Sequence, residues 1–285
     1  MYKILKKKRL NQETAEMDIL APHVANKAKP GQFIIFRVDE MGERVPLTVA
    51  GVDKEEGSVK IIFQMVGRST MQLGEKEEGE YIQDFVGPLG NHSHVEQYKG
   101  QKIAVCGGGL GAAIAYPVCK GAYEAGADVD MIAGFRNKDI IILEDEMRAN
   151  SSRCFITTDD GSNGTKGFVS DILQKLIDEG TKYDHVIAIG PMIMMKVTCE
   201  LAAKYDIPCT VSMNTIMVDG TGMCGCCRLT VGGETKFACV DGPEFDGHKV
   251  DFDEAMLRSR TYFKHEQEDK EEHICNLTGE VRKHG

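Results

Sequence analysis

Four of the ten cysteines of this chain fall within one short segment, residues 218–239, with the sequence VDGTGMCGCCRLTVGGETKFAC. Thiolate sulfur is a strong ligand for zinc and for iron, and the ligands of a metal must converge on one point. Two ligands separated by two residues at a glycine-rich turn converge with little strain. This segment is therefore predicted to bind a metal centre.

The spacing of the candidate ligands favours an iron–sulfur cluster. Asp219, Cys224, Cys227 and Cys239 follow the pattern D-x4-C-x2-C-x11-C. With cysteine at the first position, this would be the C-x4-C-x2-C run of plant-type [2Fe–2S] proteins, whose last ligand comes from a separate strand. We therefore predict a [2Fe–2S] cluster with three thiolates and one carboxylate. Because a carboxylate is a harder donor and can be protonated, we expect a pH-dependent reduction potential.

Two alternatives remain open for this segment. The same four side chains could form a tetrahedral zinc site. Cys226 could replace Cys227 as a ligand, but a C-x-C pair strains the turn and breaks the spacing, so Cys226 is interpreted as a neighbour of the cluster. Glycines in the loop favour the cluster, because they let backbone N–H groups turn toward sulfide. They are Gly220, Gly222 and Gly225.

A second candidate site is the run KIAVCGGGLGAAIAY, which has the pattern of a strand, a glycine turn and a helix. Gly107, Gly109 and Ala112 satisfy G-x-G-x-x-A, and Gly108 and Gly111 complete the turn. The N-terminus of the following helix would face the phosphates of a dinucleotide. This run predicts a nicotinamide-dinucleotide site.

The acid that usually accompanies such a turn is not at the expected place. Asp128 and Asp130 have nearly the right separation but begin the next strand, whereas ribose ligands lie at the carboxyl end of a strand. We reject them for that reason. Arg136 follows that strand, and Asp159 and Asp160 follow the next one. These carboxylates would repel a 2′-phosphate and favour NADH, whereas Arg136 favours NADPH.

The composition argues against several classes of protein. The net charge of −10 and the lack of a recurring Lys/Arg cluster argue against a nucleic-acid partner. No apolar stretch approaches the ~20 residues of a membrane helix, and the N-terminus has no apolar signal core, so we expect a cytoplasmic protein without a membrane contact. Outside the cluster segment, five cysteines lie in apolar runs and are expected to be reduced core residues. They are Cys106, Cys119, Cys154, Cys199 and Cys209.

The elements that position these sites change character near residue 100. Short alternating segments separated by turns predict an antiparallel β-barrel over residues 1–98, with one helical interruption at 69–75. Buried strands then alternate with helices near 112–126, 143–150, 168–179 and 192–204, which predicts a parallel α/β domain over residues 99–215. The cluster loop is placed at 216–250, and the five methionines of 192–217 are interpreted as core residues.

Residues 251–285 form the last predicted unit. The segment 252–263 spaces its apolar residues at helical intervals. The remainder is charged and poor in apolar residues, so we expect a solvated tail, with an arm that is ordered only against a partner subunit as the alternative.

Taken together, these motifs resemble those of the small subunits of NADH-dependent ferredoxin:NADP+ oxidoreductases, sulfide dehydrogenases and dihydroorotate dehydrogenases. The resemblance covers residues 1–250. It implies an FAD-binding barrel, a ferredoxin-reductase-like nucleotide-binding domain and a C-terminal [2Fe–2S] loop. The dihydroorotate dehydrogenase subunits have a fourth cysteine where this chain has Asp219, and the ferredoxin:NADP+ oxidoreductase subunits resemble this chain in having aspartate there.

The resemblance also supplies candidate residues for FAD. In RVPLT, it implies that Arg44 pairs with the FAD pyrophosphate and that Thr48 lies near the flavin ring, with Pro46 and Leu47 between them. The turn VGRST would hold phosphate at the start of a short helix, or else be only a capped helix start. The residues of this turn assigned to FAD are Gly67, Arg68, Ser69 and Thr70.

The segment IGPMIMM resembles the turn that closes over the nicotinamide in relatives. Gly190, Pro191 and Met192 are its candidate contacts, and the usual cysteine is missing. No titratable residue is predicted to be catalytic, because hydride transfer requires alignment of two rings and no protein base.

The function that this resemblance implies is electron transfer between NAD(H), FAD and a [2Fe–2S] cluster. The family couples NADH and reduced ferredoxin to NADP+ reduction, reversibly, by electron bifurcation or confurcation. The implied partner is a larger subunit that carries a second FAD and [4Fe–4S] clusters and binds NADP(H) and ferredoxin. The alternatives are an electron-supplying subunit for dihydroorotate or sulfide dehydrogenation, and a zinc-stabilised dinucleotide sensor without turnover.

Overall fold

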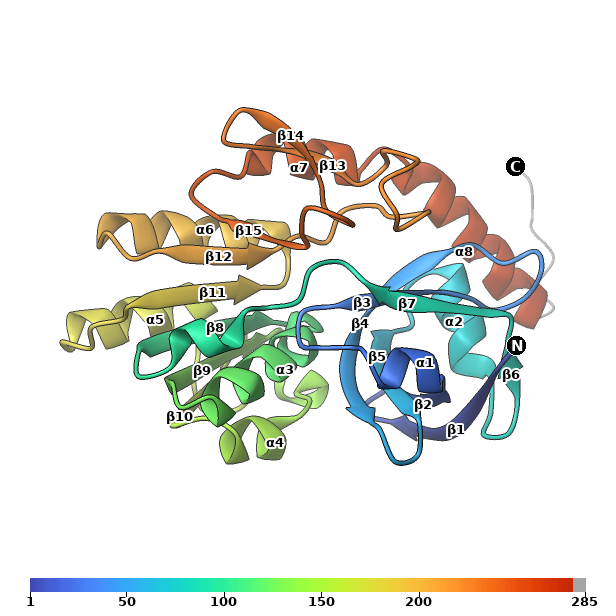
Figure 1. Ribbon diagram of the computed structural model, residues 1–285, viewed down its shortest axis with the longest axis horizontal. Helices are drawn as coiled ribbons and strands as arrows, with labels where there is room; N and C mark the ends of the chain where they lie inside the picture. Colours follow the sequence, from blue (N-terminus) through green and yellow to red (C-terminus); the bar gives the residue numbers. More distant parts are fainter. Residues whose placement is uncertain (279–285) are drawn as a thin grey trace.

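The computed structural model describes residues 1–278, without the side chains of Glu272 and residues 274–278. Figure 1 shows a β-barrel and an α/β domain side by side, with the C-terminal segment crossing above both. This arrangement confirms the predicted fold class. It also brings the candidate sites of three distant parts of the sequence to one side of the barrel.

The barrel is a seven-stranded antiparallel sheet with the order β6-β1-β2-β5-β4-β3-β7. The alternation of side chains in β2 shows why these segments form a barrel with one buried face. Ala15, Met17 and Ile19 are buried in the barrel core, and the residues between them face outward. The elements of this part are β1 (Tyr2–Arg9), β2 (Thr14–Leu20), α1 (Pro22–Ala25), β3 (Phe33–Arg37), β4 (Val45–Asp53), β5 (Ser58–Gln64), α2 (Arg68–Glu75), β6 (Tyr81–Ile82) and β7 (Asp84–Leu89).

The α/β domain is built on a six-stranded sheet with the order β10-β9-β8-β11-β12-β15. All neighbouring strands are parallel except β15, which pairs with β12 in the antiparallel direction. The elements are η1 (Val95–Tyr98), β8 (Lys102–Gly108), α3 (Gly111–Glu124), β9 (Asp128–Phe135), η2 (Lys138–Ile140), α4 (Glu144–Ala149), β10 (Arg153–Thr158), α5 (Val169–Asp178), β11 (His185–Ile189), α6 (Met192–Lys204) and β12 (Cys209–Ser212).

The strand order places a crevice between β8 and β11. The chain moves outward from β8 to β9 and β10 and then returns to β11 on the other side of β8. The connections that follow β8 and β11 therefore lead to opposite faces, and ligands of open α/β sheets bind in the resulting gap at the carboxyl ends of the strands. Both glycine turns predicted from the sequence lie at this gap.

Residues 213–278 contain more regular structure than the sequence predicted. The segment expected to be a loop contains a two-stranded hairpin. A third strand in this segment joins the large sheet. A solvated tail was expected, but up to residue 278 this part of the chain forms a helix that packs against α2 (Figure 1). In this contact, the His273 ring lies 3.1 Å from the carboxylate of Glu75. Residues 279–285 lie outside the described part. The elements are β13 (Arg228–Val231), β14 (Glu234–Phe237), β15 (Glu244–Asp246), α7 (Phe252–Ser259) and α8 (Phe263–Thr278).

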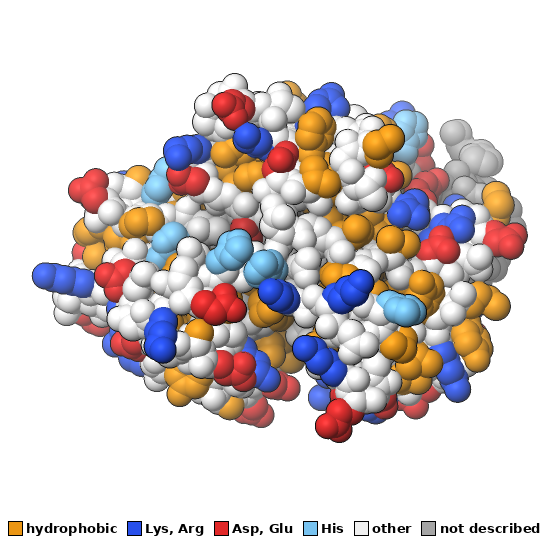
Figure 2. Space-filling view, viewed as in Figure 1, with side chains coloured by type: hydrophobic (Ala, Val, Ile, Leu, Met, Phe, Trp, Pro, Cys, Tyr) orange, Lys and Arg blue, Asp and Glu red, His pale blue; other side chains and the backbone are white. Residues whose placement is uncertain are grey.

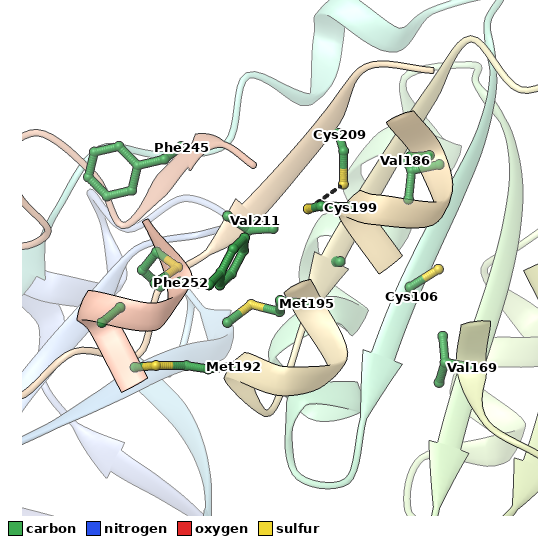
Figure 3. Packing of buried hydrophobic residues seen from close by; sticks show 14 of the residues in the cluster. Cys106, Val169, Val186, Met192, Met195, Cys199, Cys209, Val211, Phe245 and Phe252 are labelled. Atoms are coloured by element: carbon green, nitrogen blue, oxygen red, sulfur yellow. Dashed lines mark hydrogen bonds between the residues drawn. The ribbon is translucent and has the colours of Figure 1, made fainter. Parts of the chain in front are cut away.

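The core beneath β12, α6 and α7 is rich in sulfur. Figure 3 shows Met192 and Met195 on α6 beside Phe252 of α7, and the thiols of Cys199 and Cys209 facing each other. Met195 is fully buried, and the Cys199 and Cys209 sulfurs lie 3.1 Å apart. The prediction of core methionines is therefore confirmed for Met192, Met195, Met213 and Met217, which are all buried.

The surface carries no large region of one charge on the face drawn in Figure 2, where acidic and basic side chains are interspersed. Within residues 1–278, no helix is both long and apolar enough to cross a bilayer.

Candidate functional site

A cavity of about 960 Å³ lies between the barrel and the carboxyl ends of the parallel strands. The barrel contributes β4, and the α/β domain contributes the turns after β8 and β11. The structure thus brings together ten residues that the sequence assigned to FAD or the dinucleotide. They are Pro46, Leu47, Thr48, Gly108, Gly109, Gly111, Arg136, Asp159, Gly190 and Pro191.

The two glycine turns pack backbone against backbone. A Cβ atom on Gly111 would lie 2.5 Å from the carbonyl oxygen of Ile189, and a Cβ atom on Gly107 would lie 2.7 Å from the Cα atom of Ala112. A Cβ atom on Gly190 would similarly lie 3.0 Å from the backbone nitrogen of Gly108. Glycine is therefore required for this close approach, which leaves the N-terminus of α3 open to the cavity. This cradle fits a dinucleotide phosphate.

Three predicted residues lie behind this cradle and do not line the cavity. Gly107 and Ala112 form the contact between β8 and α3, and both are buried. Met192 is also buried and begins α6. Their place indicates a supporting position for the turns.

The two candidate acids after β10 differ in position. Asp159 lines the cavity with Arg136, whose guanidinium lies 4.0 Å from the carboxylate of Glu13. Asp160 does not line the cavity and is exposed. Its carboxylate accepts a hydrogen bond of 2.9 Å from the Ser162 amide, and its bonds with Ser162 lower its pKa. Asp159 is therefore the acid better placed for a ribose hydroxyl.

The rejected acid Asp130 has a structural position. It is fully buried at the amino end of the sheet, where Lys102, Arg153 and Tyr183 all donate hydrogen bonds to it at 2.5–2.6 Å. Burial alone would raise its pKa, but these bonds keep the pKa below its ordinary value. Asp130 is thus a paired buried charge at the end of the sheet opposite to the cavity.

Arg44 contacts the cysteine segment. Its guanidinium donates to the backbone carbonyls of Val218 at 2.8 Å and Asp219 at 3.3 Å, and Arg44 does not line the cavity. The barrel is thereby joined to the start of the cysteine segment. The pairing of Arg44 with a pyrophosphate stays a prediction.

The turn at residues 66–70 is a capped helix start. The Thr70 hydroxyl accepts hydrogen bonds from the amides of Val66 and Gly67, and the Ser69 hydroxyl donates to Glu43. Gly67 is the N-cap of α2 and Arg68 its first residue. None of these four candidate residues, 67–70, lines the cavity. The bonds match the alternative of a capped helix, and the phosphate role stays a prediction.

The cysteine segment forms two groups of thiols. The sulfurs of Cys227 and Cys239 lie 3.2 Å apart and are buried, and burial together with Cys227 raises the pKa of Cys239 to about 12. Cys224 is exposed, and a hydrogen bond from the Cys226 backbone lowers its pKa. Cys227, rather than Cys226, is therefore the partner of Cys239.

Asp219 faces its own loop. Its carboxylate accepts hydrogen bonds from the Thr221 amide at 2.9 Å and from the Met223 amide at 3.3 Å. Among residues 1–278, no three His, Cys, Asp or Glu side chains meet in a ready metal site. The buried pair Cys227–Cys239, with Cys224 on the same loop, fits thiolate ligation of iron, and the full set of four ligands stays a prediction.

The sequence missed the part of the cavity that follows β12. Asn214, Thr215 and Met217 line it, and the Thr215 hydroxyl is buried with no hydrogen-bond partner among the described residues. Their position at the carboxyl end of a parallel strand was the available signal. From the barrel side, Phe33 and Gln64 line the cavity and carried no motif.

Comparison with known proteins agrees with this geometry. Residues 214–251 match the model of the iron–sulfur cluster binding domain of dihydroorotate dehydrogenase B. Over 267 residues, the chain is 45% identical to the dihydroorotate dehydrogenase B (NAD+) electron transfer subunit homolog of Thermotoga maritima, covering 94% of this chain and 93% of the relative.

This chain belongs to the family of dihydroorotate dehydrogenase B electron-transfer subunits and their homologues.

The chain is also similar to solved structures. One chain of an NADH-dependent reduced ferredoxin–NADP oxidoreductase, a structure described for flavin-based electron bifurcation, is 42% identical and covers 96% of this chain and 98% of its own length, with a TM-score of 0.90. The ferredoxin reductase of carbazole 1,9a-dioxygenase has a TM-score of 0.58 at 16% identity, covers 73% of this chain and 65% of its own, and shares the fold alone. The predicted family and the ferredoxin-reductase-like fold are both confirmed. This family member is an electron-transfer subunit of an oxidoreductase.

Proposed function

We propose that this chain transfers electrons between NAD(H), FAD and a [2Fe–2S] cluster as the small subunit of an NADH-dependent ferredoxin:NADP+ oxidoreductase. The observation that carries the proposal is the shared cavity, in which the barrel strand β4 faces the two glycine turns of the nucleotide-binding domain. The high similarity to a chain of such an oxidoreductase over almost the whole length supports the same function.

The cavity has the size and lining that the two redox partners need. Its volume of about 960 Å³ lies at the upper end of the range for ligand sites. Pro46, Leu47 and Thr48 would contact the flavin, while Gly109 and Gly111 would leave space for the phosphates of NAD(H). When bound here, FAD would supply the link between two-electron hydride chemistry and one-electron transfer. The role of the chain is to orient the two rings and exclude water.

The cluster would lie in the segment that follows the cavity. Asp219, Cys224, Cys227 and Cys239 are the proposed ligands, and all four lie within residues 214–251, the range that matches the iron–sulfur family model. Met217 lines the cavity and lies two residues before Asp219, so the chain leads directly from the flavin region to the cluster loop.

We further propose four functional units with the boundaries predicted from the sequence. They are an FAD-binding barrel at 1–98, an NAD-binding domain at 99–215, a cluster loop at 216–250 and a C-terminal unit at 251–285.

The partner belongs to the same proposal. Relatives of this family are electron-transfer subunits, so this chain works with a larger subunit. We propose that the larger subunit carries a second FAD and [4Fe–4S] clusters, binds NADP(H) and reacts with ferredoxin. Electron bifurcation would take place there, and this chain would deliver or accept single electrons through its cluster.

Anaerobic purification of the full chain tests the proposal. We expect a yellow-brown protein with one FAD, two irons and two sulfides per chain, as expected for a [2Fe–2S] flavoprotein, and reduction of both centres by NADH. With the co-purified larger subunit, NADH and reduced ferredoxin together should reduce NADP+. A colourless protein with one zinc ion would overturn the proposal, and transfer of electrons only from dihydroorotate would assign the alternative family activity.

A further inference from the structure

The cysteine segment is held at one end by a side chain of the barrel. Arg44 precedes β4, and its guanidinium donates hydrogen bonds to the carbonyl oxygens of Val218 and Asp219, as described above. These are contacts across more than 170 positions of sequence, so they arise only in the folded protein. They fix the backbone at the first proposed ligand.

A second arginine holds the other end of the ligand segment. Arg258 of α7 donates through Nε to the carbonyl oxygen of Arg228 at 3.1 Å and through Nη2 to that of Cys226 at 3.4 Å. These two carbonyls flank Cys227 on both sides. The segment from residue 218 to residue 228, which contains three of the four proposed ligands, therefore lies between two guanidinium groups from different parts of the fold.

Both guanidinium groups lie outside the salt bridges of the described residues, and the charge of Arg44 acts on the carboxylate of Asp219, itself a proposed ligand. Within residues 1–278, neither Arg44 nor Arg258 forms an ion pair, whereas Arg37 pairs with Asp84 and Arg148 with Glu144. Both side chains are also partly buried, where a charge acts more strongly than it does in bulk water. A reduced iron–sulfur cluster has one more negative charge than the oxidised form. Nearby positive charge therefore favours reduction of the cluster.

We propose that Arg44 and Arg258 are positioning residues for the iron–sulfur centre, which fix both ends of its ligand loop and raise its reduction potential. The inference rests on the proposed function, because it requires the cluster in this segment. It assigns Arg44 to the cluster loop through contacts in the structure.

The test compares variants of the full chain, purified anaerobically with its larger subunit. Arg44→Gln and Arg258→Gln remove the charge, whereas Arg44→Lys keeps the charge and loses the two-pronged hydrogen bonding. Arg148→Gln on α4 is the matched control, because its guanidinium pairs with Glu144 far from the cysteine segment in the sequence and fold. Iron and sulfide content, EPR-monitored redox titration and hydrogen exchange of residues 218–228 are measured for each.

We expect each Gln variant to shift the reduction equilibrium of the cluster toward the oxidised form, by up to about tenfold, equal to 59 mV for one electron. Amides of residues 218–228 should exchange faster in these variants. Arg44→Lys should keep the wild-type potential but show the faster exchange, and Arg148→Gln should change neither.

The outcomes separate this inference from the proposed function. A wild-type protein without iron and sulfide would overturn both. A wild-type protein with a normal cluster, together with Gln variants of unchanged potential and unchanged exchange, would overturn the inference alone. If a Gln variant fails to assemble a cluster, the Arg44→Lys variant decides, since wild-type exchange in that variant contradicts the positioning role.

Discussion

Two pairs of cysteines in this protein have almost the same sulfur–sulfur distance and different surroundings. Cys199 and Cys209 lie 3.1 Å apart beneath the parallel sheet, and Cys227 and Cys239 lie 3.2 Å apart at the base of the cysteine segment (Figure 3 shows the first pair). All four side chains are buried. The distance between two thiols therefore does not distinguish a core pair from a pair of metal ligands.

The backbone around each pair makes the difference. Cys199 lies in α6 and Cys209 in β12, where backbone N–H groups are used in regular hydrogen bonding. Hydrogen bonding with Cys199 and burial both raise the pKa of Cys209 above its ordinary value, so Cys209 stays a thiol. The other pair adjoins a loop with three glycines at positive φ, and the exposed Cys224 lies on that loop.

This contrast identifies what a cluster site needs beyond two close sulfurs. A cluster requires further donors nearby and backbone N–H groups that can turn toward sulfide. The loop at 219–227 supplies both, because Gly220 has a φ of +85° that an L side chain rarely adopts. The core pair has the Cys106 thiol near it but, in the described part of the chain, no glycine loop whose N–H groups could turn toward sulfide, and it serves as packing.

Replacing one thiol of each pair gives the largest expected difference. Cys239→Ala should remove the iron and sulfide of the purified protein almost completely, because one of the four ligands of the cluster is lost. Cys209→Ala, the matched control in the core, should keep both at wild-type levels. Iron and sulfide analysis, together with visible spectroscopy, measures the cluster content of both variants. Equal iron and sulfide content in the two variants would contradict the distinction between a ligand pair and a core pair.

Acid should destabilise the region of the core pair. His185 hydrogen-bonds Thr210 next to Cys209, and burial lowers its pKa to about 4. The unfolded chain binds this proton near pH 6.5, whereas the folded chain binds it only near pH 4, so stability is lost as the pH falls between these values. From pH 7 to pH 5 we expect a loss of about 2 kcal/mol in the free energy of unfolding from this group.

Urea unfolding of the wild type and His185→Gln at both pH values measures this effect. The variant should lose clearly less stability between pH 7 and pH 5. An equal loss in both proteins would assign the acid sensitivity to other groups.

The core pair should contribute to stability in proportion to its burial. Cys209→Ala removes a buried sulfur and leaves the Cys199 thiol without its partner, so we expect a loss of about 1–2 kcal/mol. Urea unfolding at pH 7 measures it. Cys154→Ala, at a partly exposed cysteine of β10, is the control and should cost less.

Substitution of the carboxylate sharpens the comparison further. Asp219→Cys would give the cluster four thiolates, and we expect a higher reduction potential with unchanged iron content, because the harder oxygen donor favours the oxidised metal. Redox titration of both proteins provides the measurement. Superimposable titration curves would show that Asp219 does not bind the cluster.

The sequence allowed most elements of the fold to be predicted, because the signals involved are local. Alternating apolar residues gave the barrel strands, and strands alternating with helices gave the parallel sheet. The hairpin of β13 and β14 and the helix α8 were missed, because their residues are polar and their structure depends on contacts with α7 and α2. The glycine turns were found for a similar local reason: each has a sequence pattern of its own.

For the candidate site, the sequence by itself determined the chemistry, and the tertiary structure decided which groups meet. Covalent spacing brought Asp219, Cys224 and Cys227 within one loop, whatever the rest of the chain does. Packing decided that Cys239 joins Cys227, that Arg44 binds the loop instead of lining the cavity, and that Thr215 enters the cavity. These contacts join residues from separate elements, and no local pattern specifies them, because their energy depends on burial and geometry that exist only in the folded chain.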